Sequence, residues 1–385
     1  MNKEFDYIIC GAGLSGLMLI KKMFDDEFFT EKKILLLDND FMHKHHKTWC
    51  FWESKNSYWD DYIYKSWDNI IFKTSDYKND YYLNNYRYKM IQSKSFFDKI
   101  INKIKLSDNI FSLKASVLSF DESDDKVCID IGSDKFYTKF FFNSSLELNK
   151  IKNLNNFDFL LQHFKGWRIK TKKNFFDKER ATIMDFSVEQ KNATTFFYVL
   201  PFSENEALIE YTLFSKTVLN DKDYDAALKN YIKSIGIDDY SIIDTEIGSI
   251  PMTAFPFEKN NSTRIIHIGT AGGWTRPSTG YTFKFIEKNT VKLLNHIKTV
   301  DYKRIISFRN RHWIYDLIFL NVLCNHNIGK DLFFKMFSKN KIDDIFSFLD
   351  SDSTFLSELR IFSSFPIFIF IKALIKNFRK IIFNL

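Results

Sequence analysis

The sequence predicts an α/β fold made of a parallel sheet, a mostly antiparallel sheet and a helical C-terminal part. The pattern of residues 5–38 predicts a strand, a glycine turn, a helix and a second strand. Several strand-like runs follow between about residues 157 and 215, and helical patterns dominate from about residue 285. This order of elements is typical of proteins that place helices against a parallel sheet and carry a second sheet beside it.

The composition indicates a folded chain of one large or two smaller domains. Of the 385 residues, 45% are hydrophobic and 27% are charged, which excludes disordered, collagen-like and coiled-coil proteins. An AT-rich coding sequence explains most of the excess of 43 Phe, whereas the 12 Gly are informative because they are so few. A chain poor in Gly keeps it where backbone geometry or a close approach requires it. Seven of the 12 fall in two segments, residues 11–16 and 269–280.

Other features concern the environment of the chain and its partners. The four cysteines are widely separated without a C-x-x-C pair, which argues against a zinc site or a disulfide framework and for a reducing compartment. We find no secretory signal, and the apolar runs 315–324 and 361–371 are too short or too interrupted for a bilayer span of about 20 residues. His43, His45 and His46 stand among lysines, so we expect a solvated loop there and not a metal site. The net charge of +7 is only weak support for an anionic partner; neither a metal nor a nucleic acid is expected.

The first glycine segment has the organisation of a dinucleotide-binding turn. Phe5 to Cys10 form the first predicted strand, a G-x-G-x-x-G turn follows at once, and a second strand from Lys33 ends in Asp38. The first glycine permits the turn, the second lets the backbone approach a pyrophosphate, and the third lets helix and strand pack closely. The predicted cofactor-binding residues here are Gly11, Ala12, Gly13, Leu14, Gly16 and Asp38.

The acid at the end of the second strand suggests which nucleotide binds. Asp38 can accept hydrogen bonds from a ribose that has no 2′-phosphate, so FAD or NAD is favoured over NADP as the tightly bound nucleotide. The spacing does not separate FAD from NAD. A glycine turn that merely closes a βαβ unit is the structural alternative.

The middle of the chain is predicted to be rich in strands. Residues 58–90 are read as antiparallel strands, 94–105 as a helix, and 117–142 as a hairpin followed by a strand. Runs at 166–171, 181–186 and 194–201 are further predicted strands. In the next run, residues 207–215, Glu210 stands among apolar and aromatic neighbours. Burial would raise the pKa of this carboxyl, as a proton donor at neutral pH requires; an ordinary Glu on the exposed face of an edge strand is the alternative.

The second glycine segment follows a predicted strand, residues 264–268, and precedes a predicted helix that runs to about His296. A strand, a glycine-rich turn and a helix N-terminus suit a second contact to the ribityl and pyrophosphate groups of a flavin, with Gly269 and Gly272 as the predicted contacts. The G-K-[ST] ending of a P-loop is absent from this segment. A purely structural crossover is the alternative.

Several further motifs make the chain resemble the bacterial lycopene β-cyclase family. Besides the fingerprint with Asp38, the resemblance rests on KTWCFW (47–52), QHFKGW (162–167), MDF (184–186), YVLPF (198–202), IEYT (209–212) and GWTRPSTGY (273–281). It covers nearly the whole chain. It implies a glutathione-reductase-type, Rossmann-like FAD-binding fold with an antiparallel substrate sheet and a helical C-terminal part. One departure is Asn143-Ser144-Ser145, where relatives often have Asp-Ser and a basic residue, so the role of that acid and base is in doubt.

The resemblance implies an isomerase that converts the acyclic ψ ends of lycopene, by way of γ-carotene, into the β-ionone rings of β-carotene. Reduced FAD would act without net redox change, and NADPH or NADH would supply the reduction. Glu210 is the implied catalytic acid, and Asp185 and Glu287 are weaker candidates. Candidate pocket residues are Trp49, Trp52, Tyr211 and Trp274. The glycine segments alone would equally allow an FAD-dependent hydroxylase or isoprenoid reductase, and a carotenoid or flavin carrier is a distant third.

Lycopene is a membrane-dissolved hydrocarbon, so we expect a peripheral protein at the inner, cytoplasmic face of a membrane. Residues 366–385 carry Lys372, Lys376, Arg379 and Lys380 without an acidic residue, at a spacing typical of an interfacial helix. A terminal helix packed on the protein is the alternative. The expected domains are an FAD-binding part (1–150 and 245–300), a substrate-binding sheet (151–244) and a helical part with a membrane-facing end (301–385).

Overall fold

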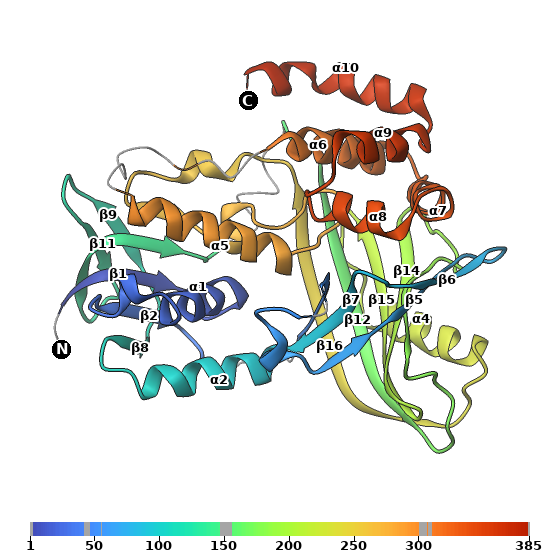
Figure 1. Cartoon of the computed structure of the whole chain (residues 1–385), viewed down its shortest axis with the longest axis horizontal. Coiled ribbons are helices and arrows are strands. Elements are labelled where there is room, and N and C mark those ends of the chain that lie inside the picture. The colour runs from blue at the N-terminus through green and yellow to red at the C-terminus, as the bar shows by residue number, and fades with distance from the viewer. Residues whose placement is uncertain are drawn as a thin grey trace.

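Three sheets and a group of C-terminal helices organise the chain (Figure 1). This computed structural model describes residues 3–41, 47–54, 56–146, 156–299, 306 and 310–383. The predicted loop with His43, His45 and His46 lies outside the described residues.

The first sheet contains the predicted parallel strands. Its order is β8-β2-β1-β11, and β17 also pairs with β11; all of these pairs are parallel, and β10 and β9 extend the sheet as antiparallel strands. The strands are β1 (Glu4–Cys10), β2 (Ile34–Asp38), β8 (Ile110–Lys114), β9 (Ser119–Glu122), β10 (Val127–Asp130), β11 (Lys135–Asn143) and β17 (Ile265–His267). The predicted hairpin followed by a strand at 117–142 is confirmed by β9, β10 and β11.

Both faces of the parallel strands are buried, which explains their continuous apolar runs. Ile9 packs in one core with residues from helices α1 (Leu14–Phe24), α2 (Ser93–Lys105) and α5 (Phe283–Lys298), whereas its neighbour Ile8 packs in another with Val127 from the β9–β10 hairpin. The predicted helices at 94–105 and after the second glycine segment are thereby confirmed as α2 and α5.

The second sheet is long, and antiparallel except for one strand pair. Its order is β16-β12-β15-β14-β13-β5-β6, and only β13 and β5 run parallel. The strands are β5 (Asn69–Lys73), β6 (Lys78–Tyr82), β12 (Phe159–Thr171), β13 (Arg180–Asp185), β14 (Thr194–Ser203), β15 (Glu206–Ser215) and β16 (Tyr240–Thr253). Helix α4 (Asp221–Ser234) packs against β12 and β15. A small third sheet pairs β7 (Arg87–Gln92) with β3 (Thr48–Glu53) and β4 (Lys65–Trp67).

The boundaries of the expected domains remain predictions, but the strands cross them. The strands β5 and β6 come from within residues 1–150, and most of β16 comes from residues 245–300, yet all three belong to the antiparallel sheet. Within the described ranges, four short 3₁₀ helices complete the connections: η1 (Glu27–Phe29), η2 (Asp60–Tyr62), η3 (Phe257–Asn260) and η4 (Gly269–Gly272).

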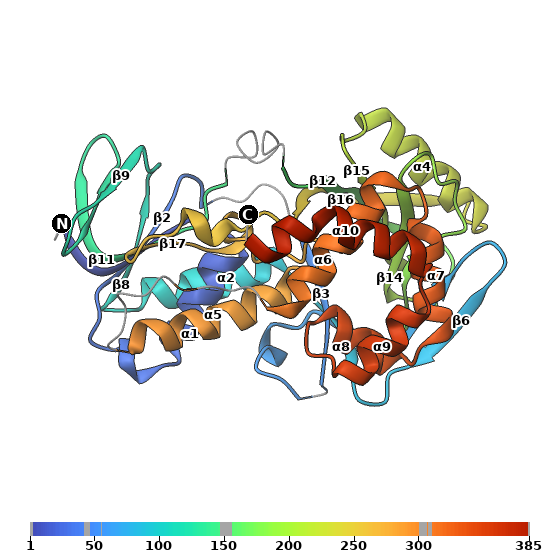
Figure 2. The same cartoon turned by 90° about the horizontal axis from the view of Figure 1, so that it is seen from above.

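The C-terminal part is helical, as predicted. Figure 2 shows α7, α8 and α9 gathered by the antiparallel sheet and α10 lying across α6. The helices are α6 (Arg311–Asn325), α7 (Gly329–Lys339), α8 (Ile342–Leu349), α9 (Phe355–Ser363) and α10 (Ile367–Phe383). They share a core with the sheet, in which the ring of Phe337 stacks on Phe72 at 4.5 Å. No helix in the described ranges is long and apolar enough to cross a membrane.

A buried ion pair joins the second glycine segment to the C-terminal helices. Nε of Arg276 lies 2.9 Å from Oδ1 of Asp316 on α6, and the hydroxyl of Ser278 donates to the same oxygen. The guanidinium of Arg276 also donates to the carbonyl of Phe348 at the end of α8. Because Arg276 is 1% exposed, its charge depends on these acceptors.

We expect Asp316→Ala to lower the free energy of unfolding by about 3–5 kcal/mol, because it leaves the buried guanidinium of Arg276 without its carboxylate. Urea denaturation followed by tryptophan fluorescence measures this change. Asp238→Ala, at an exposed loop position, is the control and should stay within about 0.5 kcal/mol of the parent. Equal stability of the two variants would contradict a structural role for the ion pair.

Candidate active site

A cavity of 790 Å³ runs from the first glycine turn to the antiparallel sheet, a volume typical of small-molecule sites. One end is lined by residues of both glycine segments, namely Ala12, Gly13, Leu14, Ser15, Gly269, Thr270 and Gly280. The other end is lined by side chains from the three central strands and from β16, namely Gln162, Phe164, Tyr198, Leu200, Leu208, Glu210 and Glu246. The two glycine segments and Glu210 therefore border one space.

The first turn has the geometry that its glycines predict. Gly11 has φ +103°, and a Cβ on Gly16 would collide with the carbonyl oxygen of Gly11. A Cβ on Gly13 would meet nothing within 4 Å, and this residue borders the cavity. The N-terminus of α1 has neither an acidic residue in its first turn nor a side-chain cap, so its N–H groups suit an anion such as a pyrophosphate.

Asp38 holds this turn against the end of β2. One carboxylate oxygen accepts from the N–H of Ala12 at 2.5 Å and the other from the N–H of Asp40 at 2.7 Å. The contact to Ala12 fixes the position of the acid relative to the glycine turn, as a residue that binds a cofactor ribose requires.

The second glycine segment packs directly on the first. Gly269 has φ +61°, and a Cβ there would collide with the hydroxyl of Ser15 at the start of α1. Gly272 does not line the cavity; a Cβ there would collide with the carbonyl of His267, so this glycine tightens the turn. Gly280 has φ +71° and approaches Gln162 of β12 just as closely.

Two of the four predicted aromatic pocket residues come from β3, and only one of them borders the cavity. Trp49 lines it and packs edge-on against Phe96 of α2 at 5.7 Å. Trp52 does not line it; its indole stacks at 4.4 Å on Phe346 of α8, in the core between the sheet and the C-terminal helices.

Tyr211 and Trp274 also lie away from this cavity. Successive side chains of a strand point to opposite faces, so Tyr211 lies on the face of the sheet opposite to Glu210. There it stacks on Phe197 in the core between the sheet and α4. Trp274 is fully buried in the core of α1, α2 and α5. The sequence did not single out the other aromatic residues that the structure brings to the cavity wall: Phe41, Tyr88, Phe97, Phe164, Tyr198, Tyr281 and Phe283.

Glu210 stands on a central strand, not on an edge. Its strand β15 lies between β12 and β14, and the hydroxyl of Thr212 donates to Oε1 of Glu210 at 2.8 Å. A second carboxyl comes from Glu246 on β16, because Gly166 of β12 pairs with Glu210 on one side and with Glu246 on the other. A Cβ on Gly166 would lie 3.3 Å from Cβ of Glu210 and 3.2 Å from Cγ of Glu246, so this glycine leaves room for the pair.

Burial affects both carboxyls. Burial raises the pKa of Glu210 well above the usual range of a carboxyl, and the charge and hydrogen bond of Glu246 raise it further. Burial also raises the pKa of Glu246, although hydrogen bonds with Glu210 and Thr48 oppose that shift. The half-buried Glu210 borders the cavity, while Glu246 is 7% exposed. Both shifts favour the protonated form of these carboxyls over the ionised form.

Strand alternation also explains the QHFKGW motif. Phe164 lines the cavity, whereas His163 and Lys165 point to the other face and hold α4. His163 hydrogen-bonds the hydroxyl of Tyr224, and Nζ of Lys165 lies 2.7 Å from Asp225. His163 and Lys165 are thus structural, whereas Gln162 lines the cavity with Phe164.

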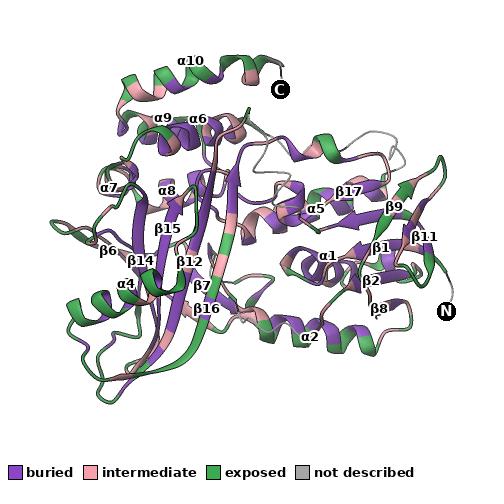
Figure 3. Ribbon diagram, turned by 180° about the vertical axis from the view of Figure 1, so that it is seen from behind, coloured by how far each residue is buried: buried purple, intermediate pink, exposed green. Residues whose placement is uncertain are grey.

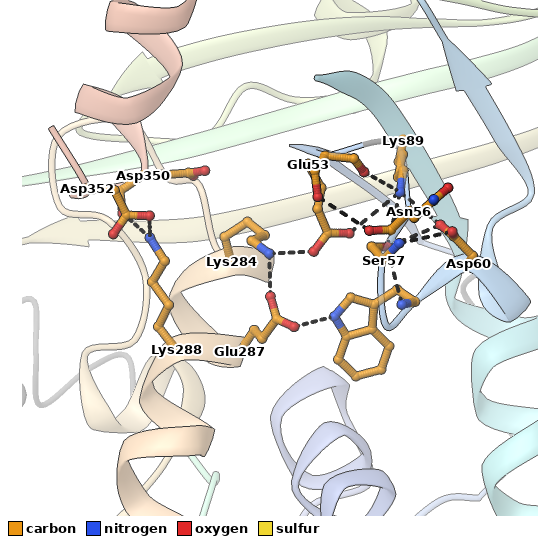
Figure 4. A network of polar contacts seen from close by, with 12 residues as sticks. Glu53, Asn56, Ser57, Asp60, Lys89, Lys284, Glu287, Lys288, Asp350 and Asp352 are labelled. Carbon is orange, nitrogen blue, oxygen red and sulfur yellow. Dashed lines mark hydrogen bonds and ion pairs between the residues drawn. The ribbon is translucent and has the colours of Figure 1, made fainter. Parts of the chain in front are cut away.

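The weaker acid candidates are held in ion pairs. Asp185 is fully buried, lies 2.8 Å from Nζ of Lys73 and accepts from the hydroxyl of Tyr231 at 2.5 Å. Glu287 belongs to the polar network of Figure 4, where it pairs with Lys284 and accepts from Nε1 of Trp59 at 2.7 Å.

The same network holds the small sheet against α5. Lys284 of α5 also reaches Glu53 of β3 at 2.7 Å, and Lys89 of β7 lies 2.8 Å from Asp60. In the part of the chain that the structure describes, neither Asp185 nor Glu287 lines the cavity with Glu210.

The sequence did not predict Glu246 as a site residue, and no local pattern could have identified it. In TEIGSIPM (245–252) it is one polar residue in a strand of mixed character. Its meeting with Glu210 depends on the register of β16 and β15 on β12, two pairings between segments more than 30 residues apart.

Comparison with known proteins agrees with this architecture. The chain is similar to a geranylgeranyl bacteriochlorophyll reductase-like protein from Thermoplasma acidophilum, with a TM-score of 0.62 and 12% identity over 97% of this chain and 98% of that one. It is also similar to a flavoprotein/dehydrogenase from Cytophaga hutchinsonii (TM-score 0.64, 11% identity, 94% and 100% covered) and to a flavin-dependent brominase (TM-score 0.57, 12% identity, 98% and 100% covered). The fold is thus the predicted FAD-binding, Rossmann-like fold of flavoproteins.

Among curated protein sequences, none matches the chain. The family described as "Lycopene cyclase protein" matches residues 6–374, which is nearly the whole chain. The chain therefore belongs to the lycopene cyclase family.

Proposed function

We propose that the protein is a lycopene β-cyclase, an isomerase that closes the ψ ends of lycopene into β-ionone rings. The observation that carries this proposal is a single cavity that joins a glycine turn suited to a flavin with a buried, proton-retaining carboxyl on an aromatic wall. Membership of the family supplies the class of substrate.

The residues around the glycine turn suit FAD. The N-terminus of α1 and the open face of Gly13 would hold the pyrophosphate, and Asp38 would bind the ribose. Gly269 would let the second glycine segment approach the nucleotide closely. Bound FAD in its reduced form, kept reduced by NADPH or NADH, would supply negative charge beside a developing cation without net transfer of electrons.

Glu210 is the proposed acid. Its proton goes to the terminal double bond of the ψ end, which leaves a tertiary carbocation. The neighbouring double bond attacks that cation and closes the ring, and loss of a ring proton to a carboxylate gives the product. Since one proton enters and one leaves, the reaction consumes neither protons nor electrons, as an isomerisation requires.

The wall of the cavity suits a carbocation. Burial raises the pKa of Tyr198 and of Tyr281, so both phenols stay neutral. Their rings and that of Trp49 offer cation–π stabilisation of about 0.5–2 kcal/mol each. Apolar neighbours such as Leu200 and Leu208 exclude the water that would trap the cation.

Helix α10 is the proposed membrane-facing end. Ala373 and Asn377 face the protein and are buried, and apolar side chains on the opposite side of the helix are exposed. These are Ile367, Phe368, Ile371, Leu374, Ile375, Phe378 and Ile382. Figure 3 shows much of α10 in the colours of exposed and intermediate residues. The exposed cations Lys372, Lys376 and Arg379 flank one edge of this face, which suits peripheral binding to the anionic cytoplasmic surface of a membrane.

The function is tested by expressing the gene in cells that accumulate lycopene and separating the pigments. Conversion to γ-carotene and β-carotene is expected. A product with added oxygen or hydrogen would instead indicate a flavin-dependent hydroxylase or isoprenoid reductase, to which the fold is equally suited. Unchanged lycopene bound to the protein would indicate a carrier.

We expect Glu210→Gln to retain flavin and to lower the rate of ring formation by about 10²–10⁴-fold, the usual contribution of general acid catalysis. The rate of ring formation by purified protein with reduced FAD and lycopene in liposomes measures the effect. Glu189→Gln removes the charge of an exposed carboxyl and should leave the rate unchanged. A rate for Glu210→Gln near that of the parent would remove Glu210 from the acid role.

We expect the double substitution Phe368→Ser/Ile375→Ser to weaken binding to anionic liposomes about tenfold or more, because these side chains are 86% and 70% exposed on the proposed face. Liposome flotation measures binding. Leu106→Ser, at a side chain that is 87% exposed after α2, is the matched control. Equal flotation of all three proteins would argue that α10 is only a packed terminal helix.

A further inference from the structure

We propose that Glu246 shares the proton of Glu210 and connects it to water, so that the two carboxyls act as one proton-holding unit. In this scheme Glu210 meets the substrate, and Glu246 is a positioning residue that acts through it. The inference deepens the proposed cyclase function and rests on it for its catalytic meaning.

The sheet places the two carboxyls together. Strand β12 pairs antiparallel with β15 and with β16, and Gly166 is opposite Glu210 in one register and Glu246 in the other. Side chains at paired positions lie on the same face of a sheet. Because Gly166 has no side chain between them, the two glutamates meet above it, and each affects the pKa of the other.

One oxygen of Glu246 requires this proton. Oε1 is fully buried and has no hydrogen-bond partner among the described residues. A buried carboxylate oxygen without a donor, beside a second buried carboxylate, is strongly unfavourable. A proton between Glu210 and Glu246 removes one of the two charges and supplies the missing donor.

Glu246 also borders a second, polar cavity. This space of 220 Å³ is lined by Lys47, Thr48, Gln92, Lys94, Arg168, Phe202, Leu208, Asp244, Thr245 and Glu246. Lys47, Lys94, Asp244 and Thr245 are exposed at its rim. Glu246 is the one carboxyl among the described residues that lines both cavities. With cofactor and substrate in the larger cavity, the smaller one remains as the water-facing side of the pair.

The pair accounts for both proton transfers. Before the reaction the two carboxyls hold one proton. When the O–H bond of Glu210 breaks and the new C–H bond forms, two carboxylates face each other in a dry site, and their repulsion makes the pair a strong base. The ring proton then returns to the pair as the last C–H bond breaks and its electrons form the ring double bond. No oxidant, reductant or further acid is required.

Infrared spectroscopy of the flavin-loaded protein at neutral pH tests the shared proton independently of activity. We expect a protonated-carboxyl C=O band that shifts in D₂O and disappears or moves in both Glu210→Gln and Glu246→Gln. Glu189→Gln should leave the band unchanged. A parent protein without the band, or a band unaffected by Glu246→Gln, would overturn the shared proton.

Kinetics test what the shared proton does. We expect Glu246→Gln to lower kcat at least tenfold with little change in KM, and Glu246→Asp to restore part of the rate. Glu210→Gln/Glu246→Gln should be no slower than Glu210→Gln alone, because residues that act as a unit are not additive. Flavin content and thermal melting exclude misfolding of each variant.

The pH profile gives a readout that a merely structural role would not move. Glu246, when ionised, raises the pKa of Glu210, so its replacement by the neutral amide lets Glu210 ionise at lower pH; the alkaline limb of kcat should therefore shift to lower pH. The other charged groups that line the two cavities are Asp244 on β16, Arg168 on β12, Lys47, and Lys94 with Asp98 on α2. The neutral titratable groups there are Cys50, Tyr88, Tyr198 and Tyr281. All of them remain in the variant.

The outcomes separate the two proposals. A parent protein that shows the infrared band yet forms no rings overturns the cyclase function and leaves the shared proton in place. Ring formation by the parent with full activity and an unshifted pH profile in Glu246→Gln overturns the role of Glu246 and leaves the cyclase function in place.

Discussion

The pairing of β12 with its two neighbours is the constraint on which the site depends. A slip of one residue in either register would turn every side chain of the slipped strand to the opposite face. Glu210 or Glu246 would then point toward α4, and the two carboxyls would no longer meet above Gly166. Ten residue pairs with β15 and thirteen with β16 fix this register. A single strand thus determines where the two carboxyls meet.

The cavity exists because two glycine segments, more than 250 residues apart, pack against each other and against that strand. Ser15 approaches Gly269 at the nucleotide end, and Gln162 of β12 approaches Gly280 at the other, in each case where a Cβ would collide. Close backbone approach therefore sets the distance between the nucleotide-binding turn and the carboxyl pair. Gly269 and Gly280 are therefore positions where this geometry requires glycine.

Local patterns predicted the strand, turn and helix at residues 5–24 and the position of Glu210 in a strand with buried neighbours, because each depends on residues close in sequence. The aromatic wall was harder to predict. Trp49 borders the cavity, but Tyr211 faces α4 because alternation turns it away from Glu210, and Trp274 fills a core. Glu246 could not have been found, since its environment comes from pairing across the sheet. The fold was thus predictable in outline. The site was predictable only for residues whose surroundings are set by one continuous segment of the chain.

The ion pair of Arg276 and Asp316 has a consequence for how helix α10 and the cavity are related. Helix α10 packs on α6, which carries Asp316, the partner of Arg276. Arg276 belongs to the same segment as Gly280, which lies against Gln162 in the wall of the cavity. Only a few rigid contacts therefore separate the outermost helix from the wall. The C-terminal helices thus support the wall of the cavity through continuous packing contacts. The surface that would meet the lipid and the space that would receive the carotene are connected by these contacts.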